Sequence, residues 1–396
     1  MQPHQVMQNW YRLVLELVRH TPTYSPPVAS RALAYMGVTA FEVVAGGNGD
    51  LRSLAGQLQE LTPVPAREVG GQYDEAVVMH TALAAVTGGL FSNTGPTGQR
   101  AMRAMETKLG ARISAGVAPE TVARSEAHGR AIAQHILAWS VGDGGAVVEN
   151  MGFPLALELP KGPQYWVPTS VIRLQQFPLL PDWGNNRTIA MPTATTCKLP
   201  GPPEYSEDKG SAFYAQAQEV LEVSRKLDAE QIEIANFWAD DSMLSQTPAG
   251  HWISIAWSLL ERENADAVRS ADVLARLGVG MADAFIGCWQ GKYDYNLVRP
   301  VTYINRVMDP KWVPPVTTPP FPEYPSGHST QSGAAAEVLT ALYGENFAFE
   351  DNSHADEGLP ARSFSSLRAA ADEAGISRLY GGIHYRAAIE DGLEQG

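Results

Sequence analysis

The sequence predicts an all-α protein built as one large helical-bundle domain. Apolar residues recur at the three- and four-residue spacing of a helix along most of the chain. The composition is 44% hydrophobic and 18% charged, which supplies enough apolar side chains for a sizeable core. Glycine and proline gather instead in one loop-rich excursion near 142–210. Because no Gly/Ser linker or block of like charge divides the 396 residues, we expect a single domain over 1–396.

The first part of the chain, 1–141, is expected to form a first helical bundle. Its clearest helical stretches are "LVLELVR" and "ETVARSEAHGRAIAQHILAWS". The spacing of apolar residues predicts helices over 5–20, 28–46, 75–93, 99–116 and 118–141. In the loop-rich connection 142–210 that follows, "QYWVPTSVIRLQQFPLLPDWG" offers at most a short hairpin.

The last part, 211–396, is expected to form a second helical bundle. Ser211 is of the residue type that caps a helix N-terminus, and helical spacing resumes directly after it. We expect helices over 211–239, 251–262, 266–294, 327–343 and 365–380. The proline-rich run 313–325 is stiff, because each proline fixes its own φ and biases the preceding residue to an extended conformation.

Charge and composition exclude several classes of partner. A net charge of −14 argues against nucleic acid or an anionic membrane surface. No run of about 18 uncharged apolar residues occurs, so we expect no membrane insertion. The first 30 residues carry charges within their apolar stretch and do not resemble a secretory signal. The compartment stays open: a removed signal would favour the periplasm or secretion, and its absence the cytoplasm. A homo-oligomer is also left open.

The motif "PSGH" stands where a helix is expected to begin. Pro325 favours an extended residue before the helix, Ser326 is a capping residue, and Gly327 lets a ligand approach the backbone. A helix N-terminus offers free N–H groups and the positive end of the helix dipole, which suit an oxyanion. His328 lies in the same first turn. Alone, the motif also fits a plain helix cap with an exposed histidine.

Two further stretches carry cations. In "GKYDYNLVRP", Lys292 and Arg299 are seven positions apart, so on a continuous helix they would share a face, and Pro300 places Arg299 near the helix end. In "SRLYGGIHYR", a Gly pair breaks the helix between Arg378 and His384, so both side chains converge only if the chain turns there. Each stretch alone also fits a solvated or structural role.

Taken together, the three motifs resemble those of the vanadium-dependent haloperoxidases and of the type 2 phosphatidic acid phosphatase superfamily that shares their site. The shared pattern is Lys, six residues, Arg-Pro; then Pro-Ser-Gly-His; then Ser-Arg, five residues, His. The resemblance implies the helical-bundle fold of this group. It also implies that vanadate or phosphate is the cofactor or ligand, held through its oxygens by Lys292, Arg299, Ser326, Gly327 and Arg378.

The resemblance also assigns the chemistry. His384 would be the axial ligand of vanadium, or the nucleophile of a phosphatase, and His328 the general acid and base. Lys292 would polarise bound peroxide. In the haloperoxidase branch the partners are hydrogen peroxide, a halide and a small organic acceptor.

Several residues around the motifs favour the haloperoxidase branch. Trp289 and Phe321 stand where chloroperoxidase-like members similarly carry aromatics, and with Ser329 they would shape a halide pocket. Both aromatics equally fit a role in the core. The stretch "NFWADDSMLSQTPAGHW" resembles a signature of the bacterial members, and it would supply Asp240 as a carboxylate partner for Arg378 or His328.

One position departs from the family pattern. The superfamily commonly has Asp four residues after the second histidine, where this chain has Ala388, so the carboxylate that orients His384 is left open. Three hypotheses follow. The first is a vanadium-dependent haloperoxidase, favoured because a ligand tolerates the change better than a nucleophile. The second is an acid phosphatase on the same scaffold, and the third is a non-catalytic oxyanion-binding protein in which Ala388 marks a lost activity.

Overall fold

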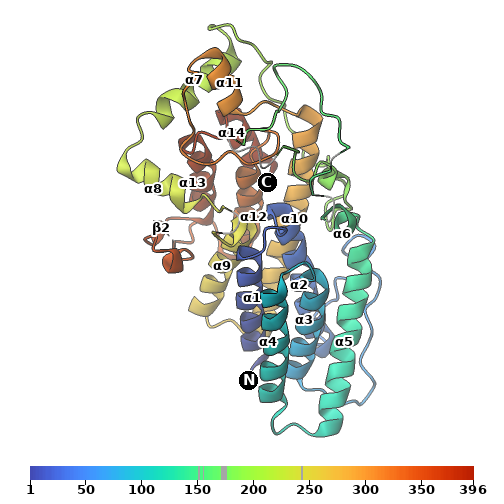
Figure 1. The fold of residues 1–396 in the computed structure, drawn as a ribbon. Coiled ribbons are helices and arrows are strands. Elements are labelled where there is room, and N and C mark those ends of the chain that lie inside the picture. Colours follow the sequence, from blue (N-terminus) through green and yellow to red (C-terminus); the bar gives the residue numbers. More distant parts are fainter. Residues whose placement is uncertain (150–151, 155, 171–175, 242–243) are drawn as a thin grey trace. The chain divides into compact units, whose positions relative to one another are not determined.

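The fold is mostly helical, as predicted. The computed structural model describes the chain except for residues 150–151, 155, 171–175 and 242–243. Within the described residues it contains fourteen α-helices and one two-stranded sheet (Figure 1). Part of the expected hairpin, 171–175, lies outside the described residues. Next to it, Tyr165 forms an isolated antiparallel bridge with Leu297.

The five helices expected in the first part of the chain are confirmed. Their bounds are α1 Pro3–Arg19, α2 Pro26–Gly47, α3 Glu75–Leu90, α4 Pro96–Ser114 and α5 Pro119–Val141. Four of them begin at a proline, which has no N–H to leave unpaired in the first turn. The fifth, α3, is capped by Asp74, whose carboxylate accepts the Val77 N–H at 3.0 Å.

The chain forms two compact units, each made of several segments. Unit 1 comprises Met1–Ala146, Arg187–Ala190 and Asp241–Ala282, and unit 2 comprises Val147–Asn186, Met191–Asp240 and Asp283–Gly396. In unit 1, α3 packs against α1, α2, α4 and α5, and α9 (Thr247–Arg262) packs against α1 and α2. The expectation of a single domain over 1–396 stays a prediction.

Close helix packing and a buried ion pair hold unit 1 together. A Cβ added at Gly129 of α5 would lie 2.6 Å from the Val78 carbonyl oxygen of α3, so only glycine permits this approach. Arg31 Nε donates to Asp143 Oδ2 at 2.7 Å, and the Tyr35 hydroxyl donates to the same oxygen at 2.6 Å. The paired charges are therefore also hydrogen-bonded, which offsets the cost of burying them.

Helix α2 is long and apolar enough to cross a membrane by length and composition alone. However, 89% of its apolar window is buried inside the structure. Arg31 and Glu42 lie within the helix, and both are buried and hydrogen-bonded. This burial is what the core helix of a helical bundle shows.

Unit 2 carries the remaining elements and corrects part of the sequence prediction. They are η2 Trp183–Asn185, α7 Ala212–Ser224, α8 Ala229–Phe237, α11 Pro300–Val307, α12 Gly327–Tyr343, β1 Phe349–Asp351, η3 Ala355–Glu357, β2 Arg362–Phe364, α13 Leu367–Tyr380 and α14 Arg386–Gln395, with the short α6 Gly145–Val148 at its edge and α10 Ala267–Tyr295 entering it at Asp283. The single helix expected over 211–239 is wrong. Asp228 and Gln231 form a capping box there, which begins α8 as a separate helix.

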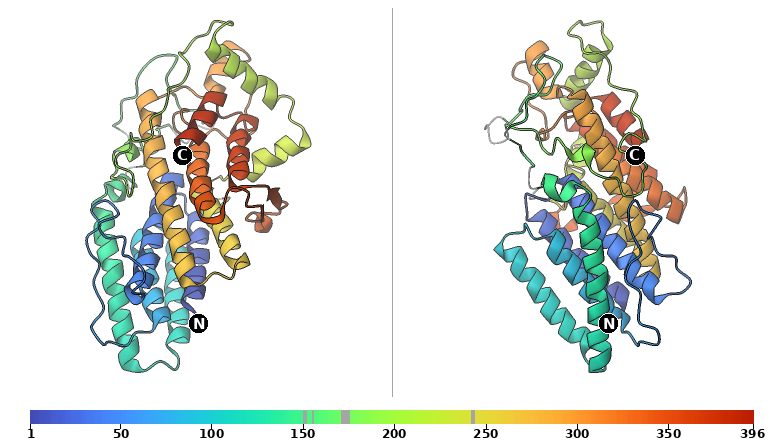
Figure 2. Two further views of the ribbon diagram at one scale, coloured as in Figure 1. Left: turned by 180° about the vertical axis from the view of Figure 1, so that it is seen from behind. Right: turned by 90° about the vertical axis from the view of Figure 1, so that its right-hand side faces the viewer.

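Helices α12, α13 and α14 pack together at the core of unit 2 (Figure 2, red end of the chain). A Cβ on Gly333 of α12 would meet the Leu393 carbonyl oxygen of α14 at 2.6 Å, so glycine allows these two helices to touch. An aromatic cluster built on Phe213, Tyr303 and Tyr385 fills the space beside them. Cys197 and Cys288 are both free.

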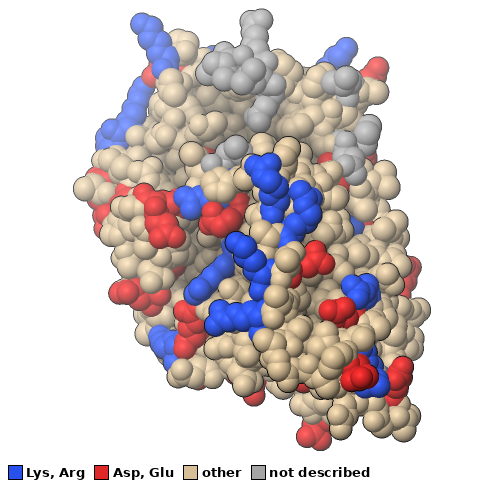
Figure 3. Space-filling view, turned by 60° about the horizontal axis from the view of Figure 1, so that its bottom comes forward, with Lys and Arg blue, Asp and Glu red and all other residues tan. Residues whose placement is uncertain are grey.

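Charge is unevenly distributed over the surface. On the face drawn in Figure 3, Lys and Arg side chains gather in one group with Asp and Glu around it. Helix α4, for example, exposes four cationic side chains, those of Arg100, Arg103, Lys108 and Arg112. The net charge of −14 is therefore an average over regions of both signs.

Candidate functional site

The structure places the residues of the three motifs at the ends of helices in unit 2. In chain order they are Lys292 in the last turn of α10, Arg299 as N-cap of α11, Ser326 as N-cap of α12 with Gly327 and His328 in its first turn, Arg378 in the last turn of α13, and His384 in the turn before α14. The side chain of His328 is 18% exposed, and the others are buried. Such positions combine cationic side chains with free backbone N–H groups.

Lys292 is fully buried and bonded to the backbone of the proline-rich run. Its Nζ donates to the carbonyl oxygens of Pro322 at 3.1 Å and Glu323 at 3.2 Å, and also to that of Pro325. Burial lowers the pKa of this amine to about 7, and the charge of Arg299 acts in the same direction. An anion close to Nζ would favour the charged form again.

Arg299 has one hydrogen-bonding atom to spare. Its Nε donates to the Phe321 carbonyl oxygen at 2.9 Å, and Nη1 donates to the Ile383 carbonyl oxygen at 2.8 Å. Its Nη2 is buried and has no hydrogen-bond partner among the residues described by the structure. Burial lowers the pKa of the guanidinium to about 10. A buried donor of this kind calls for an acceptor.

His384 lies between a carboxylate and a guanidinium. Its Nδ1 is 2.8 Å from Glu323 Oε1, and its Nε2 is 3.1 Å from Arg299 Nη1. Burial lowers the pKa of the imidazole well below its usual range, and the charge of Arg299 adds to the effect. The neutral ring therefore donates its Nδ1–H to Glu323 and keeps the lone pair of Nε2, which is the atom a ligand or nucleophile needs.

Glu323 is a site residue that sequence reasoning missed. Its Oε1 also accepts the Tyr385 N–H at 2.9 Å. Burial raises the pKa of this carboxyl to about 7, although Arg299 and Lys292 favour its charged form. The family pattern points to a position after His384 for this carboxylate, and that position is Ala388 here. The signal was a lone acidic residue in the apolar run "PPFPEYP", directly before the PSGH motif.

Ser326 and Ser329 form one hydrogen-bonded cap. Ser326 Oγ accepts from the Ser329 N–H at 3.3 Å and from the Ser329 hydroxyl at 2.9 Å. The Ser326 N–H donates to the Ala388 carbonyl oxygen at 2.9 Å, which ties α12 to α14. Since Oγ already accepts two bonds, the hydroxyl hydrogen of Ser326 is left to donate to a ligand. Ser329 thus fixes the orientation of the Ser326 side chain. This is separate from the part in a halide pocket that the resemblance suggests for Ser329.

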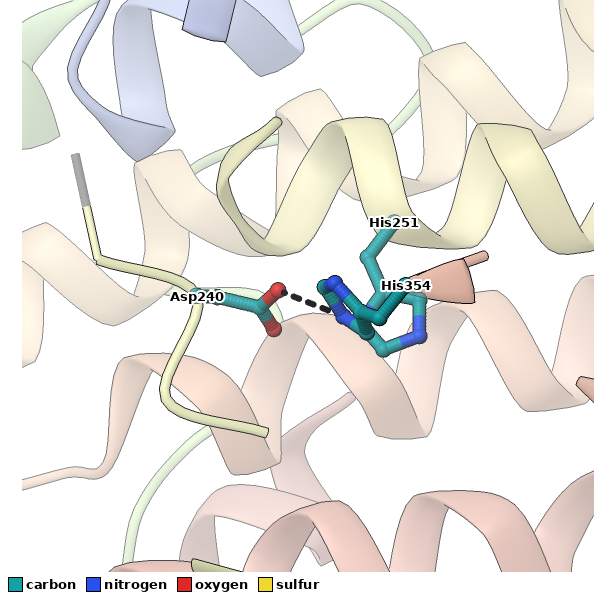
Figure 4. A group of neighbouring side chains, drawn as sticks. All are labelled: Asp240, His251 and His354. Carbon is teal, nitrogen blue, oxygen red and sulfur yellow. Dashed lines mark ion pairs between the residues drawn. The ribbon is translucent and has the colours of Figure 1, made fainter. Parts of the chain in front are cut away.

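Asp240 lies beside His328, one of the two partners expected for it. Asp240 Oδ2 is 3.6 Å from His328 Nε2, and Oδ1 is 3.5 Å from His354 Nε2. Figure 4 shows Asp240 and His354 with this ion pair as a dashed line. Arg378 donates through Nη2 to the Trp238 carbonyl oxygen and through Nε to Ser377 Oγ at 2.8 Å. His354 is a further residue that sequence reasoning missed.

Aromatic rings form the apolar side of the cation cluster. The rings of Trp289 and Phe321 are 5.0 Å apart, and Lys292 Nζ lies 5.0 Å from the Phe321 ring centre. The Trp289 Nε1–H donates to the Leu179 carbonyl oxygen at 3.3 Å, which fixes the indole. A Cβ added at Gly327 would lie 3.5 Å from Trp289 Cζ3, so the glycine leaves room beside these rings.

The donor set fits a tetrahedral oxyanion. It offers three buried cationic side chains, the spare Nη2 of Arg299, the Ser326 hydroxyl and the N-terminus of α12. The imidazole of His384 is oriented by Glu323, and the lone pair of its Nε2 faces Arg299 Nη1 at 3.1 Å. A bare metal cation would meet like charge here, whereas an oxyanion brings negative oxygens to every donor.

Comparison with known proteins gives concordant results. Residues 272–396 match the model of the VCPO second helical-bundle domain. A vanadium chloroperoxidase of Curvularia inaequalis is 33% identical over 98 residues, which are 21% of this chain and 16% of that protein. The chain thus spans only a small part of that curated relative.

Solved structures match over nearly the whole chain. The first bacterial vanadium-dependent iodoperoxidase of known structure is 38% identical, with a TM-score of 0.90 over 99% of this chain and 93% of that one. A bacterial vanadium-dependent chloroperoxidase in its apo form is 14% identical, with a TM-score of 0.72 over 95% of this chain and 91% of that one. The second likeness concerns the fold alone.

Proposed function

The chain belongs to the vanadium-dependent haloperoxidase family, and from this premise we propose that unit 2 binds vanadate at His384 and uses hydrogen peroxide to oxidise iodide. Iodide is the halide proposed because a 38% identical relative is an iodoperoxidase. It is also the common halide that gives up electrons most readily. A small organic acceptor would then take the oxidised halogen.

One observation carries the proposal: a neutral His384, aimed by Glu323, presents Nε2 beside a buried guanidinium. Nε2 would be the protein's single bond to vanadium. Lys292, Arg299 and Arg378 would offset the negative charge of the vanadate oxygens, with hydrogen bonds from Ser326 and the Gly327 N–H. Vanadate, when bound, supplies a Lewis-acidic centre that activates peroxide toward halide without changing its own oxidation state.

The remaining residues handle protons and exclude water. His328 lies at the open side of the site with a carboxylate beside it, so it can take a proton from peroxide at one stage and return a proton at a later one. The three ammonium N–H bonds of Lys292 already go to backbone carbonyl oxygens, so this side chain would act on an oxygen atom held near Nζ through its charge. Trp289 and Phe321 would flank the halide and keep water from the cations.

The test is a vanadate titration of metal-free protein followed by a peroxide assay. We expect triiodide to form from iodide and peroxide only after vanadate is added, with saturation near one vanadate per chain. His384→Ala is expected to abolish both saturation and turnover. His80→Gln, a buried histidine of unit 1, is the matched control. Absence of iodide and bromide oxidation by the vanadate-loaded chain across the stability range of pH would overturn the proposal.

Acid phosphatase activity is kept as a second candidate because of Glu323. Ala388 weighs against a histidine nucleophile only if nothing else orients the ring, and the structure supplies Glu323 for this purpose. The same contact removes the reason to regard Ala388 as the mark of a lost activity. Phosphate would bind the same donors, with His384 attacking phosphorus and His328 protonating the leaving oxygen. Hydrolysis of an aryl phosphate by metal-free protein, abolished by His384→Ala, would establish this activity.

A further inference from the structure

Four titratable side chains form a line that leads from His328 to the surface of unit 2. Asp240 Oδ2 lies 3.6 Å from His328 Nε2, and Asp240 Oδ1 lies 3.5 Å from His354 Nε2. The other ring nitrogen of His354, Nδ1, lies 3.2 Å from Glu357 Oε2. The Glu357 side chain is 20% exposed, whereas those of Asp240 and His354 are 1% and 5% exposed. Imidazole and carboxylate thus alternate from the site outwards.

Resting on the proposed function, we propose that His354 relays protons between Glu357 at the surface and the acid–base group His328, through Asp240. His354 touches no reacting atom. It acts by receiving a proton at one ring nitrogen and releasing another from the opposite one, which imidazole is built to do. The distances of 3.5 and 3.6 Å exceed those of formed hydrogen bonds, so a shift of a few tenths of an ångström accompanies each transfer.

Oxidation of a halide by hydrogen peroxide consumes a proton, which His328 would have to receive in every cycle. When peroxide oxidises a halide ion, the halide loses two electrons, the O–O bond breaks and a halogen–oxygen bond forms. One proton is taken up in each cycle, and water and the hypohalous acid are released. His328 can give a proton only once before it must be recharged. The His328 side chain is 18% exposed, but its Nε2, which faces Asp240, is buried, so a path through Asp240 would return a proton to that nitrogen.

The loop that carries His354 restrains the orientation of its imidazole ring. It connects β1 to β2, which pair antiparallel in the register Phe349 with Phe364. The His354 carbonyl oxygen accepts the Glu357 N–H at 3.0 Å, which closes the short η3 turn. The ring of Phe237 stands edge-on to the imidazole at 5.0 Å. The His354 ring is thus fixed from both its own loop and the end of α8.

The backbone of Asp240 supports the same role. Its φ is +49°, in the left-handed region that non-glycine residues adopt rarely, although Asp tolerates it better than most. Two residues earlier, the Trp238 carbonyl oxygen accepts a hydrogen bond from Arg378. Strained backbone persists where the surroundings require it, often at functional sites. This short segment after α8 thereby places one carboxylate between two imidazoles.

Kinetics with an added proton donor separate a relay from a structural role. In His354→Gln we expect kcat for iodide oxidation to fall about tenfold in dilute buffer, with the KM for peroxide and the Kd for vanadate unchanged. Added imidazole, which bypasses the relay, is expected to restore most of the loss. Glu357→Gln is expected to give a smaller loss of the same kind, and His80→Gln none. A kcat that stays at the wild-type value, or a loss that imidazole does not relieve, would overturn the relay.

A second measurement needs no vanadate. In metal-free protein labelled with ¹⁵N-histidine, exchange of the His328 ring N–H with water is expected to slow in His354→Gln and to a lesser degree in Glu357→Gln. Unchanged exchange in both variants would overturn the relay even if the enzyme is active. If the wild-type chain oxidises no halide, the proposed function fails, and this exchange still decides whether the path exists. Should His354→Gln fail to fold, Glu357→Gln carries both tests.

Discussion

Glu323 Oε1 lies 2.8 Å from His384 Nδ1, so a residue of the loop before α12 orients the histidine that stands before α14. The position on α14 where the family commonly carries the carboxylate is Ala388, which is fully buried. A cavity of about 10 Å³ lies beside it, lined in part by Glu323, Tyr385 and Ala388. In this chain the orienting group is in the loop and not on α14, and the backbone ties the two together, since the Ser326 N–H donates to the Ala388 carbonyl oxygen.

The first prediction tests whether a carboxylate at position 388 can replace that of Glu323 in orienting His384. Glu323→Ala is expected to weaken vanadate binding about 10- to 100-fold, because the ring loses the partner that fixes its tautomer. Adding Ala388→Asp to that variant is expected to recover part of the affinity, since the shortened side chain at 323 enlarges the adjoining cavity. Vanadate titration of the three proteins measures this. A double variant as weak as the single one would show that position 388 cannot take over the role.

The second prediction concerns the pH dependence of anion binding. Lys292 and Glu323 both have a pKa of about 7 in the free protein. A bound dianion favours charged Lys292 and neutral Glu323, so it raises both pKa values, and binding takes up protons above pH 7. Affinity is therefore expected to fall as pH rises through about 7 and beyond. Sulfate, which does not titrate in this range, is the suitable probe.

Calorimetry in two buffers of different ionisation enthalpy measures that proton uptake. Lys292→Met is expected to reduce the uptake as well as the affinity. Lys311→Met, at an exposed lysine of the same unit, is expected to change neither. Sulfate affinity that is independent of pH between about 6 and 9 would contradict the assignment of these two groups to the anion site.

The third prediction concerns the space beside Gly327. Its added Cβ would make ordinary contacts of 3.5 Å with Trp289 Cζ3 and 3.6 Å with Phe285 Cε1. Gly327→Ala should therefore fold normally, yet place a methyl group where an oxyanion approaches the N-terminus of α12. We expect an unchanged or raised Tm together with at least a tenfold loss of vanadate affinity. Gly88→Ala in α3, where the Cβ meets open space, is expected to leave vanadate affinity unaltered.

The fourth prediction tests the packing that supports the site. At Gly333 of α12 an added Cβ would lie 2.6 Å from the backbone oxygen of Leu393, which cannot rotate away. Gly333→Ala is expected to cost about 1–3 kcal/mol of stability by overpacking. It should also weaken vanadate binding, because α14 follows directly after His384. Gly210→Ala has open space around it and serves as the control in thermal unfolding and vanadate titration. Equal Tm values for the two variants would contradict the close packing of α12 and α14.

Sequence reasoning found the residues whose spacing is local. Ser326, Gly327 and His328 are consecutive at the start of α12. Lys292 and Arg299 do not share a continuous helix, because α10 ends at Tyr295 and Arg299 is the extended N-cap of α11, as the proline after it favours. The convergence of Arg378 and His384 followed from the Gly pair between them. Long, periodic helices such as α5 and α10 were also predicted closely, since their apolar spacing is unbroken.

Other features depend on tertiary contacts and could not be read from spacing. Glu323 is separated from His384 by sixty intervening residues, and its buried carboxylate has no local signature. His354 lies in a loop between two three-residue strands, which are too short for an alternating pattern to appear. Helices α11 and α14 were missed because they have only eight and ten residues, so the apolar spacing has few turns in which to repeat.

Positions 323 and 388 together determine how many carboxylates face His384 in a chimaeric protein. Transplanting the segment "PPFPEYPSGH" into a relative that keeps the helix aspartate would bring two carboxylates to one imidazole, and their repulsion would push a proton onto one of them. The reverse graft would leave the imidazole with none. A graft of the loop before α12 is therefore expected to keep a single orienting carboxylate only if α14 is transferred with it.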